Sequence, residues 1–191
     1  MTALAKGRYT ADEFLAATID RPRPRYELQN GEPVEMAPER AGHAYTKMYL
    51  ASALQQAAKS VGADVLPDGM SVKVNDGTVY EPDAIVRMGK KLPDDAILVP
   101  DPVVLCEVLS PSTSRIDHKD KLKGYFTIET VCHYLIVNVQ DQTISHYRRD
   151  SDGNVIGDTV SQGELVLDPP GLRLSVAAVF GKPSVKRGKR V

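Results

Sequence analysis

The stretch VVLCEVL at residues 103–109 contains a single charged residue, Glu107, in an otherwise apolar run. Apolar side chains occupy both alternating faces of this run, which indicates a strand covered on both sides in the middle of a mixed sheet. An unpaired charge in such a place costs several kcal/mol, so the Glu107 carboxyl group must be protonated, paired with a cation or bound to a metal ion. Candidates for all three partners occur elsewhere in the chain.

Length and composition predict one globular domain. The chain has 191 residues, 42% of them hydrophobic, and shows no internal repeat. We expect the domain to cover residues 1–181. Residues 182–191 carry five basic residues and little apolar content, which is typical of a mobile, solubilising tail, with phosphate contact as the alternative.

Charge and hydropathy exclude several classes of protein. The formal net charge of −1 does not fit a protein that coats nucleic acid without specificity, although it allows a local basic patch. The apolar runs are too short to span a bilayer and the N-terminus lacks a signal peptide, which predicts a cytoplasmic protein with no membrane partner. Cys106 and Cys132 are expected to be buried free thiols rather than a disulfide.

Local patterns predict a mixture of helices and short strands. The motif TADE at residues 10–13 is a capping box, and an Asn-Gly pair at residues 30–31 is typical of a hairpin turn. The strands between residues 63 and 87 are separated by turn motifs and predict a meander. The elements expected in the first half are a helix from residue 11, hairpin strands at 26–28 and 34–36, a helix over 42–61, and strands at 63–66, 71–74 and 83–87.

The second half of the chain continues this pattern. Its expected elements are the Glu107 strand, a helix over 117–128, a hairpin of strands at 133–139 and 143–149, weaker strands, a break at 169–171 and a terminal turn at 176–180. The fold class predicted from all these elements is α/β, with a mixed β-sheet flanked by helices and additional β-hairpins.

Asp83 is the first candidate partner for Glu107. It follows Pro82, which cannot donate to a ladder and fixes its own backbone angle, so Asp83 is placed at the start of a strand. Taken alone, however, a Pro-Asp dipeptide is common in ordinary turns. Mg²⁺ prefers a few carboxylates completed by water and substrate phosphate, and Asp83 and Glu107 on neighbouring strands could supply these ligands. The Val108 carbonyl oxygen could be a further ligand.

The helix after the Glu107 strand supplies a candidate cation. On a helical projection, Lys121 lies roughly 65° from the centre of the apolar stripe, whereas Lys123 lies roughly 135° away. We therefore expect Lys121 to lean inward, Lys119 to take an intermediate position and Lys123 to face solvent. An ion pair with Asp117, four residues earlier, is the competing explanation for Lys121.

A series of motifs spread over nearly the whole chain is similar to those of one protein family. The motifs are YELQNGE at 26–32, His43 at a helix start, EPD at 81–83, EVLSPST at 107–113, and then Asp117, Lys121 and Tyr125. Together they resemble the Uma-two family of predicted restriction endonucleases, a branch of the PD-(D/E)XK nuclease superfamily. The superfamily's usual lysine position is Leu109 here, and the resemblance implies that Lys121 has taken over its role from the helix.

The resemblance implies a fold, a reaction and a set of site residues. The fold would be restriction-endonuclease-like, and the reaction would be phosphodiester hydrolysis, expected in DNA and by a homodimer. Asp83 and Glu107 would bind Mg²⁺ or Mn²⁺, Lys121 would position the attacking water, and Glu27 would complete the acidic cluster. Leu135 and Asn138 depart from the family's usual aromatic residue and aspartate but leave this fold unchanged.

Several residues keep two interpretations. Glu27 either belongs to the acidic cluster or is a strand charge that faces Arg25 or solvent. His43 could contact phosphate or assist the site. Alternatively, it could cap the helix that it begins and pack locally. The hydroxyl groups within residues 110–113 are expected to cap the next helix rather than act as nucleophiles, because no Ser-His-acid pattern accompanies them.

Two other functions remain open at this point. One is a catalytically inactive protein of the nuclease fold that binds nucleic acid or a protein partner. The other is a phosphodiesterase that acts on RNA or on a small nucleotide, since the chemistry of its site would be nearly the same.

Overall fold

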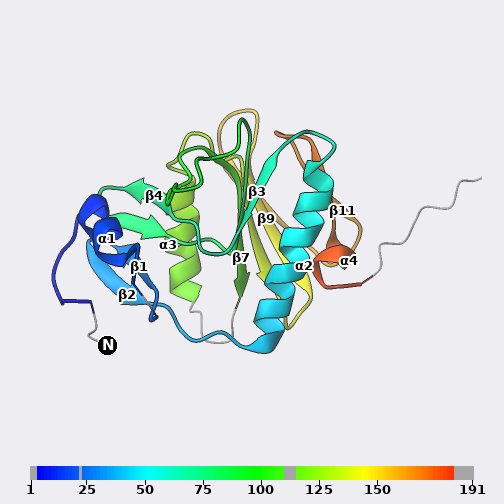
Figure 1. Ribbon diagram of the computed structural model, residues 1–191. Helices are drawn as coiled ribbons and strands as arrows, with labels where there is room; N and C mark the ends of the chain where they lie inside the picture. Colours follow the sequence, from blue (N-terminus) through cyan, green and yellow to red (C-terminus); the bar gives the residue numbers. More distant parts are fainter. Residues whose placement is uncertain (1–3, 22, 110–114, 183–191) are drawn as a thin grey trace, which may run out of the picture.

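A six-stranded mixed sheet forms the centre of the molecule (Figure 1). The computed structural model describes residues 4–21, 23–109 and 115–182, without the side chains of residues 115–117. The strand order of this sheet is β10-β9-β8-β7-β6-β3. Its strands are β3 (Asp64–Pro67), β6 (Ala84–Arg87), β7 (Pro102–Leu109), β8 (His133–Asn138), β9 (Thr143–Arg149) and β10 (Val155–Val160).

Two smaller sheets and four helices complete the described part of the chain. A four-stranded sheet has the order β2-β1-β5-β4, and β11 pairs with β12. The strands are β1 (Tyr26–Gln29), β2 (Glu32–Glu35), β4 (Val72–Asn75), β5 (Thr78–Tyr80), β11 (Glu164–Leu167) and β12 (Leu172–Ser175). The helices are α1 (Ala11–Thr18), α2 (Ala41–Ala58), α3 (Arg115–Tyr125) and α4 (Val176–Val179).

Strand β7 confirms the prediction made for the Glu107 segment. It pairs antiparallel with β6 and parallel with β8, so it is a central strand of a mixed sheet. Val104, Cys106 and Val108 pack into the core beneath α2. Because side chains alternate along a strand, Leu105 and Glu107 point to the opposite face, where α3 lies. One helix therefore covers each face of β7 (Figure 1).

The two long helices are close to their predicted positions. Helix α2 buries Leu50, Leu54 and Ala58, which recur at helical spacing and pack on the central sheet. The prediction of 42–61 overshoots its end, because the N–H groups of Ser60 and Val61 bond three residues back and start a tight turn. Helix α3 runs over Arg115–Tyr125, against a prediction of 117–128.

The predicted meander between residues 63 and 87 is wrong. Strand β3 pairs with β6 in the central sheet, whereas β4 pairs with β5 in the four-stranded sheet. Strand β5 was not predicted from the sequence as a separate strand. All three residues of β5 are buried, and β5 joins β4 to the hairpin of β1 and β2. The chain therefore leaves the central sheet after β3 and returns to it at β6.

Several smaller predictions are confirmed. Thr10 and Glu13 form the capping box of α1. The turn between β1 and β2 uses Asn30 and Gly31, both with positive φ, which suits a two-residue hairpin. The thiols of Cys106 and Cys132 are free and Cys106 is buried, as predicted, but the predicted burial of Cys132 is wrong, because this residue is half-buried.

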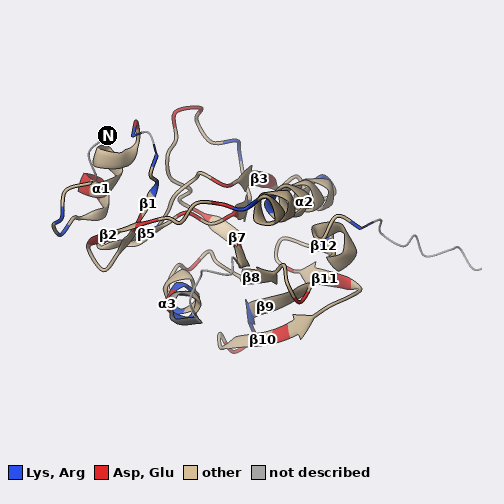
Figure 2. Cartoon of the chain, turned by 90° about the horizontal axis from the view of Figure 1, so that it is seen from below, with Lys and Arg blue, Asp and Glu red and all other residues tan. Residues whose placement is uncertain are grey.

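Of the predicted tail, the structure describes Lys182. Residues 183–191 of the tail lie outside the described residues, and Lys182 donates to Gln142. Lys and Arg residues are spread over several elements, including α2, α3 and β9 (Figure 2). Within the described residues, no helix is long and apolar enough to cross a membrane.

Candidate active site

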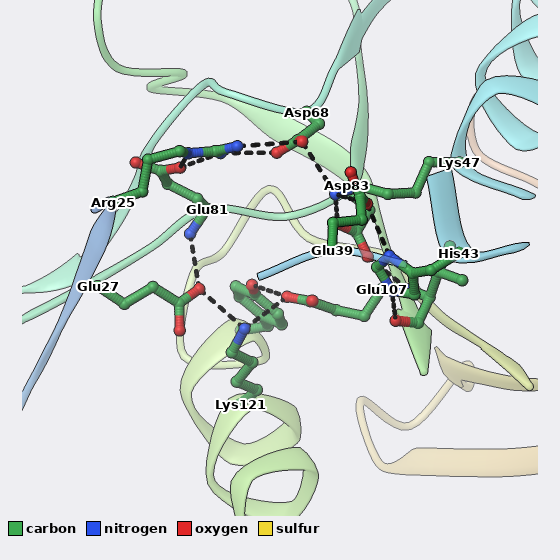
Figure 3. Close-up of polar contacts among 12 residues, drawn as sticks. Arg25, Glu27, Glu39, His43, Lys47, Asp68, Glu81, Asp83, Glu107 and Lys121 are labelled. Atoms are coloured by element: carbon green, nitrogen blue, oxygen red, sulfur yellow. Dashed lines mark hydrogen bonds and ion pairs between the residues drawn. The ribbon is translucent and has the colours of Figure 1, made fainter. Parts of the chain in front are cut away.

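Glu107 is held by two donors from α3 (Figure 3). Its Oε1 atom accepts hydrogen bonds from Lys121 Nζ at 3.0 Å and from the Tyr125 hydroxyl group at 2.8 Å. All three side chains are buried. The carboxylate that looked unpaired in the sequence therefore has a cation and a neutral donor as partners.

Lys121 bridges Glu107 and Glu27. Its Nζ atom lies 2.8 Å from Glu27 Oε1, and Glu27 also accepts from the backbone N–H of Glu81. The Lys121 side chain is 7% exposed, whereas Lys119 and Lys123 are exposed. The inward orientation predicted for Lys121 is therefore confirmed, and a helix-surface position is wrong for it. The Asp117 side chain, its predicted competing partner, lies outside the described residues.

Compared with water, the surroundings of Glu107 shift its carboxyl group towards the protonated form. Burial raises the pKa of Glu107, against the attraction of Lys121 and with additional repulsion from Asp83 and Glu27. The three carboxyl groups thus share one electrostatic environment. A further positive charge at this place would be favourable.

Asp83 directly precedes β6 and lies across from Glu107. Ala84 pairs with Cys106 in the ladder, so continuing the register by one residue sets Asp83 opposite Glu107. The Asp83 N–H donates to the Cys106 carbonyl oxygen at 2.9 Å. Its Oδ2 atom accepts from the Val108 N–H at 2.6 Å. The backbone of β7 therefore fixes the orientation of the Asp83 carboxylate.

Lys47 on α2 belongs to this cluster and was not among the candidate residues predicted from the sequence. Its Nζ atom lies 2.8 Å from Asp83 Oδ1 and 2.9 Å from carboxylate oxygens of both Glu39 and Asp68. Burial opposes the charge of Lys47, but the three carboxylates outweigh this and raise its pKa. Lys47 stands three residues before Leu50 on the buried stripe of α2, and that spacing could have identified it as an inward lysine.

Arg25 pairs with the carboxylates at the end of the cluster formed by Asp68 and Glu81. It donates to both carboxylate oxygens of Asp68, at 2.7 and 3.1 Å, and to Glu81 at 2.9 Å through its Nε atom. Arg25 therefore pairs with Asp68 and Glu81, so the interpretation of Glu27 as a charge facing Arg25 or solvent is wrong. Glu27 is buried against Lys121 instead.

His43 connects α2 to the end of β7. Its Nε2 atom lies 2.6 Å from the Val108 carbonyl oxygen, and its Nδ1 atom lies 2.7 Å from Glu39 Oε1. Both partners are oxygen atoms, one from a carboxylate and one from the backbone. His43 thus packs locally against the strand that carries Glu107. The hydroxyl groups at residues 110–113 lie outside the described residues.

The donor set of this cluster fits a divalent cation of the magnesium type. The oxygens of Asp83, Glu107 and the Val108 carbonyl group are hard ligands, and Mg²⁺ uses only one or two carboxylates together with water and substrate phosphate. Both carboxylates already bind lysine ammonium groups, which shows that the site accommodates positive charge. Among the described residues, no three His, Cys, Asp or Glu side chains form a ready metal cage. The set therefore fits an open site rather than a closed structural one.

Comparison with solved structures defines the class of the fold. A structure from Anabaena variabilis, described as a putative nuclease belonging to DUF820, matches the chain with a TM-score of 0.73 at 18% sequence identity. The match covers 90% of this chain and 97% of that chain. The chain thus has the restriction-endonuclease-like fold of such nucleases, as predicted.

The family follows from the sequence. A model of the Uma2 family, described as "Putative restriction endonuclease", matches residues 11–179, so the chain belongs to this family. This finding confirms the family suggested by the motifs. A search of curated proteins finds no match.

Proposed function

We propose that this protein is a metal-dependent endonuclease that hydrolyses phosphodiester bonds in DNA. One observation carries the proposal. Asp83 and Glu107 lie opposite each other on adjoining strands, and the buried Lys121 ammonium group contacts Glu107. Two carboxylates and one lysine at a sheet end supply the groups that phosphoryl hydrolysis needs. Membership of the Uma2 family supports the same class of reaction.

The acidic pair and Lys121 have distinct roles in this proposal. Asp83, Glu107 and the Val108 carbonyl group would hold Mg²⁺ or Mn²⁺, which when bound polarises the scissile phosphate as a Lewis acid. Lys121 would orient the attacking water and stabilise the charge that develops on the phosphate oxygens. The water oxygen forms a bond to phosphorus and the bond to the leaving oxygen breaks, which gives a phosphate monoester and a hydroxyl group.

Glu27 and His43 would act through other groups. Glu27 accepts from Lys121 and from the Glu81 N–H, so it fixes the direction in which the lysine points. His43 holds the Val108 carbonyl group and thereby the end of β7. We assign both residues a positioning role.

The direct test is cleavage of plasmid DNA by the purified protein in Mg²⁺ or Mn²⁺, with a chelator as the blank. Cleavage is expected only with a divalent cation, and Asp83→Ala and Glu107→Gln variants should lose it. Lys123→Met is the matched control for Lys121→Met, since Lys123 is exposed on the same helix. Cleavage that survives in both acidic variants would sink the proposal.

The same assay separates the alternatives. DNA binding without turnover in any divalent cation would indicate an inactive protein of the nuclease fold. Parallel reactions with single-stranded DNA, RNA and small phosphodiesters would identify another substrate. The homodimer, the cytoplasmic location and the extent of the domain over residues 1–181 remain predictions from the sequence. Sedimentation of the purified protein tests the first of these.

A further inference from the structure

Both oxygen atoms of the Asp83 carboxylate have a partner within the protein. The Oδ2 atom accepts a hydrogen bond from the Val108 N–H group at 2.6 Å, and the Oδ1 atom lies 2.8 Å from Lys47 Nζ. The Asp83 side chain is only 7% exposed, so water has little access to replace either partner. A divalent cation that binds Asp83 therefore has to take an oxygen atom that is already in use.

The two partners of Asp83 differ in how easily they can move away. Val108 is buried in β7 and pairs with Val137 of β8, so its N–H group is fixed by the central sheet. An N–H group that lost its acceptor there would be left unsatisfied. Lys47 reaches Asp83 from α2 through a flexible stem of four carbon atoms. The Oδ1 atom is therefore the place where one cation can be exchanged for another.

Lys47 has two other carboxylates to hold it when it leaves Asp83. Its Nζ atom lies 2.9 Å from an oxygen atom of Glu39 and 2.9 Å from one of Asp68 (Figure 3). The Glu39 and Asp68 side chains are 32% and 24% exposed, which is more than Asp83. The ammonium group can thus give up Asp83 without becoming an unpaired buried charge.

The surroundings of Lys47 leave room for such a movement. A groove of about 480 Å³ between α2 and β3 is lined by Lys47 and by its three carboxylate partners, Glu39, Asp68 and Asp83. The net charge of these four side chains is negative, which favours the entry of a cation. A cation that comes through the groove meets Lys47 and Asp83 together.

Glu107 does not present the same conflict. Its donors Lys121 and Tyr125 both contact the Oε1 atom, so they leave the Oε2 atom of this carboxylate to a cation. Of the two carboxylates in the proposed metal site, Asp83 is therefore the one whose lysine stands in the way.

We propose that Lys47 competes with the divalent cation for Asp83 and thereby sets the affinity of the site for that cation. Two positive charges on the Oδ1 atom repel each other, so binding of the cation shifts the Lys47 ammonium group onto Glu39 and Asp68. The inference rests on the proposed function, because it concerns the same metal site. It adds a regulation of that site, since the site fills only when the free cation outcompetes the lysine.

Calorimetric titration of Mn²⁺ into chelator-treated protein tests the inference without turnover. Lys47→Met removes the ammonium group and keeps an apolar side chain of similar length. If Asp83 is free of Lys47 for about one tenth of the time, the dissociation constant of Mn²⁺ should fall about tenfold in this variant. Lys59→Met is the matched control, because Lys59 is exposed at the end of the same helix, and it should bind like the wild type. An unchanged or higher dissociation constant in Lys47→Met would overturn the inference.

A double-mutant cycle separates displacement of Lys47 from the mere loss of a positive charge. Glu39→Gln removes one of the carboxylates that receive the lysine, so it should weaken Mn²⁺ binding more in the wild type than in Lys47→Met. Glu39 is exposed, and the double variant has one unpaired carboxylate fewer than Lys47→Met, so it remains suitable for titration if Lys47→Met folds poorly. Equal effects of Glu39→Gln in the two backgrounds would contradict the displacement.

The results for the lysine and for the nuclease are independent of each other. Tighter Mn²⁺ binding by Lys47→Met in a protein that cuts no nucleic acid would support the competition and contradict the proposed function. Metal-dependent cleavage with an unchanged dissociation constant in Lys47→Met would overturn the competition and leave the proposed function intact.

A crystal of the wild-type protein soaked in Mn²⁺ gives a check that needs no variant. With the ion bound at Asp83, Lys47 Nζ should remain within hydrogen-bond distance of Glu39 and Asp68 and should have left the Oδ1 atom of Asp83. A lysine that still contacts this atom beside the bound ion would overturn the inference.

Discussion

The contact between Glu107 and Lys121 explains how a charged residue is tolerated in the central strand. Each side chain is almost fully buried, and the Tyr125 hydroxyl group supplies a further donor to Glu107. Breaking such a pair leaves an uncompensated buried charge, which costs more than the pair contributes. Burial and function are therefore linked at this residue.

Removal of the Lys121 ammonium group should destabilise the protein strongly. Lys121→Met leaves Glu27 and Glu107 buried together without their cation, and we expect the free energy of unfolding to fall by roughly 3–5 kcal/mol. Lys123→Met on the exposed face should change it by less than about 0.5 kcal/mol. Urea unfolding at neutral pH measures both.

A second substitution checks the cause of this loss. Adding Glu107→Gln to Lys121→Met removes the unpaired charge, so the double variant should be more stable than the sum of the two single changes predicts. Additive effects would show that the two side chains are not coupled.

Lys47 shows what the sequence could not reveal about the site. Its partners Asp68 and Asp83 are 21 and 36 positions away along the chain, and Asp68 stands in a Pro-Asp-Gly segment typical of turns. Glu107, Asp83 and Lys121 were predictable because an apolar strand, a Pro-Asp pair and a helical stripe single them out. The pairing of Lys47 with these two distant carboxylates leaves no such local signal beyond the spacing of the lysine on α2.

At the scale of elements, strong periodic patterns were predictable and short ones were not. Helix α2 and strand β7 were located correctly, since burial of one helix stripe or of both strand faces leaves a clear pattern. Strand β5 has three residues and pairs with β1, more than 45 positions earlier. Its pairing with the preceding β4 is local, but three residues are too few to show a strand period, and its pairing with β1 leaves no trace in the nearby sequence.

The pairing of β8 with β9 buries two histidines and predicts a pH-dependent stability. His133 Nδ1 lies 2.9 Å from His146 Nε2, and burial lowers the pKa of both, that of His146 to about 4. The unfolded chain keeps a pKa near 6.5, so it binds more protons than the folded protein between these values. The contribution of these histidines to the free energy of unfolding should be fully present above about pH 6.5. It should fall by up to about 3 kcal/mol as the pH drops towards 4.

Urea unfolding between pH 4 and 7 tests this expectation, with His146→Leu as the comparison. The variant removes one titrating group, so its stability should depend less steeply on pH even though His133 loses a partner. Equal slopes in the two proteins would assign the acid sensitivity to other groups.

At the scale of the whole molecule, a cation that binds the folded state but not the unfolded state should stabilise the protein. Free Mn²⁺ at about 100 times its dissociation constant adds roughly 2.7 kcal/mol, which for a protein of this size raises the melting temperature by roughly 5–10 °C. Asp83→Ala and Glu107→Gln should abolish this rise. Calorimetric melting with and without a chelator gives the measurement, and an equal rise in both variants would place the ion elsewhere.

The most direct test of the proposed metal site is the position of Mn²⁺ in a crystal of the protein, found from its anomalous scattering. We predict one peak about 2 Å from carboxylate oxygens of both Asp83 and Glu107, with Lys121 beside it. The proposed metal site would be contradicted if, in a crystal soaked in Mn²⁺, these carboxylates contact only their lysine partners and any anomalous peak lies elsewhere.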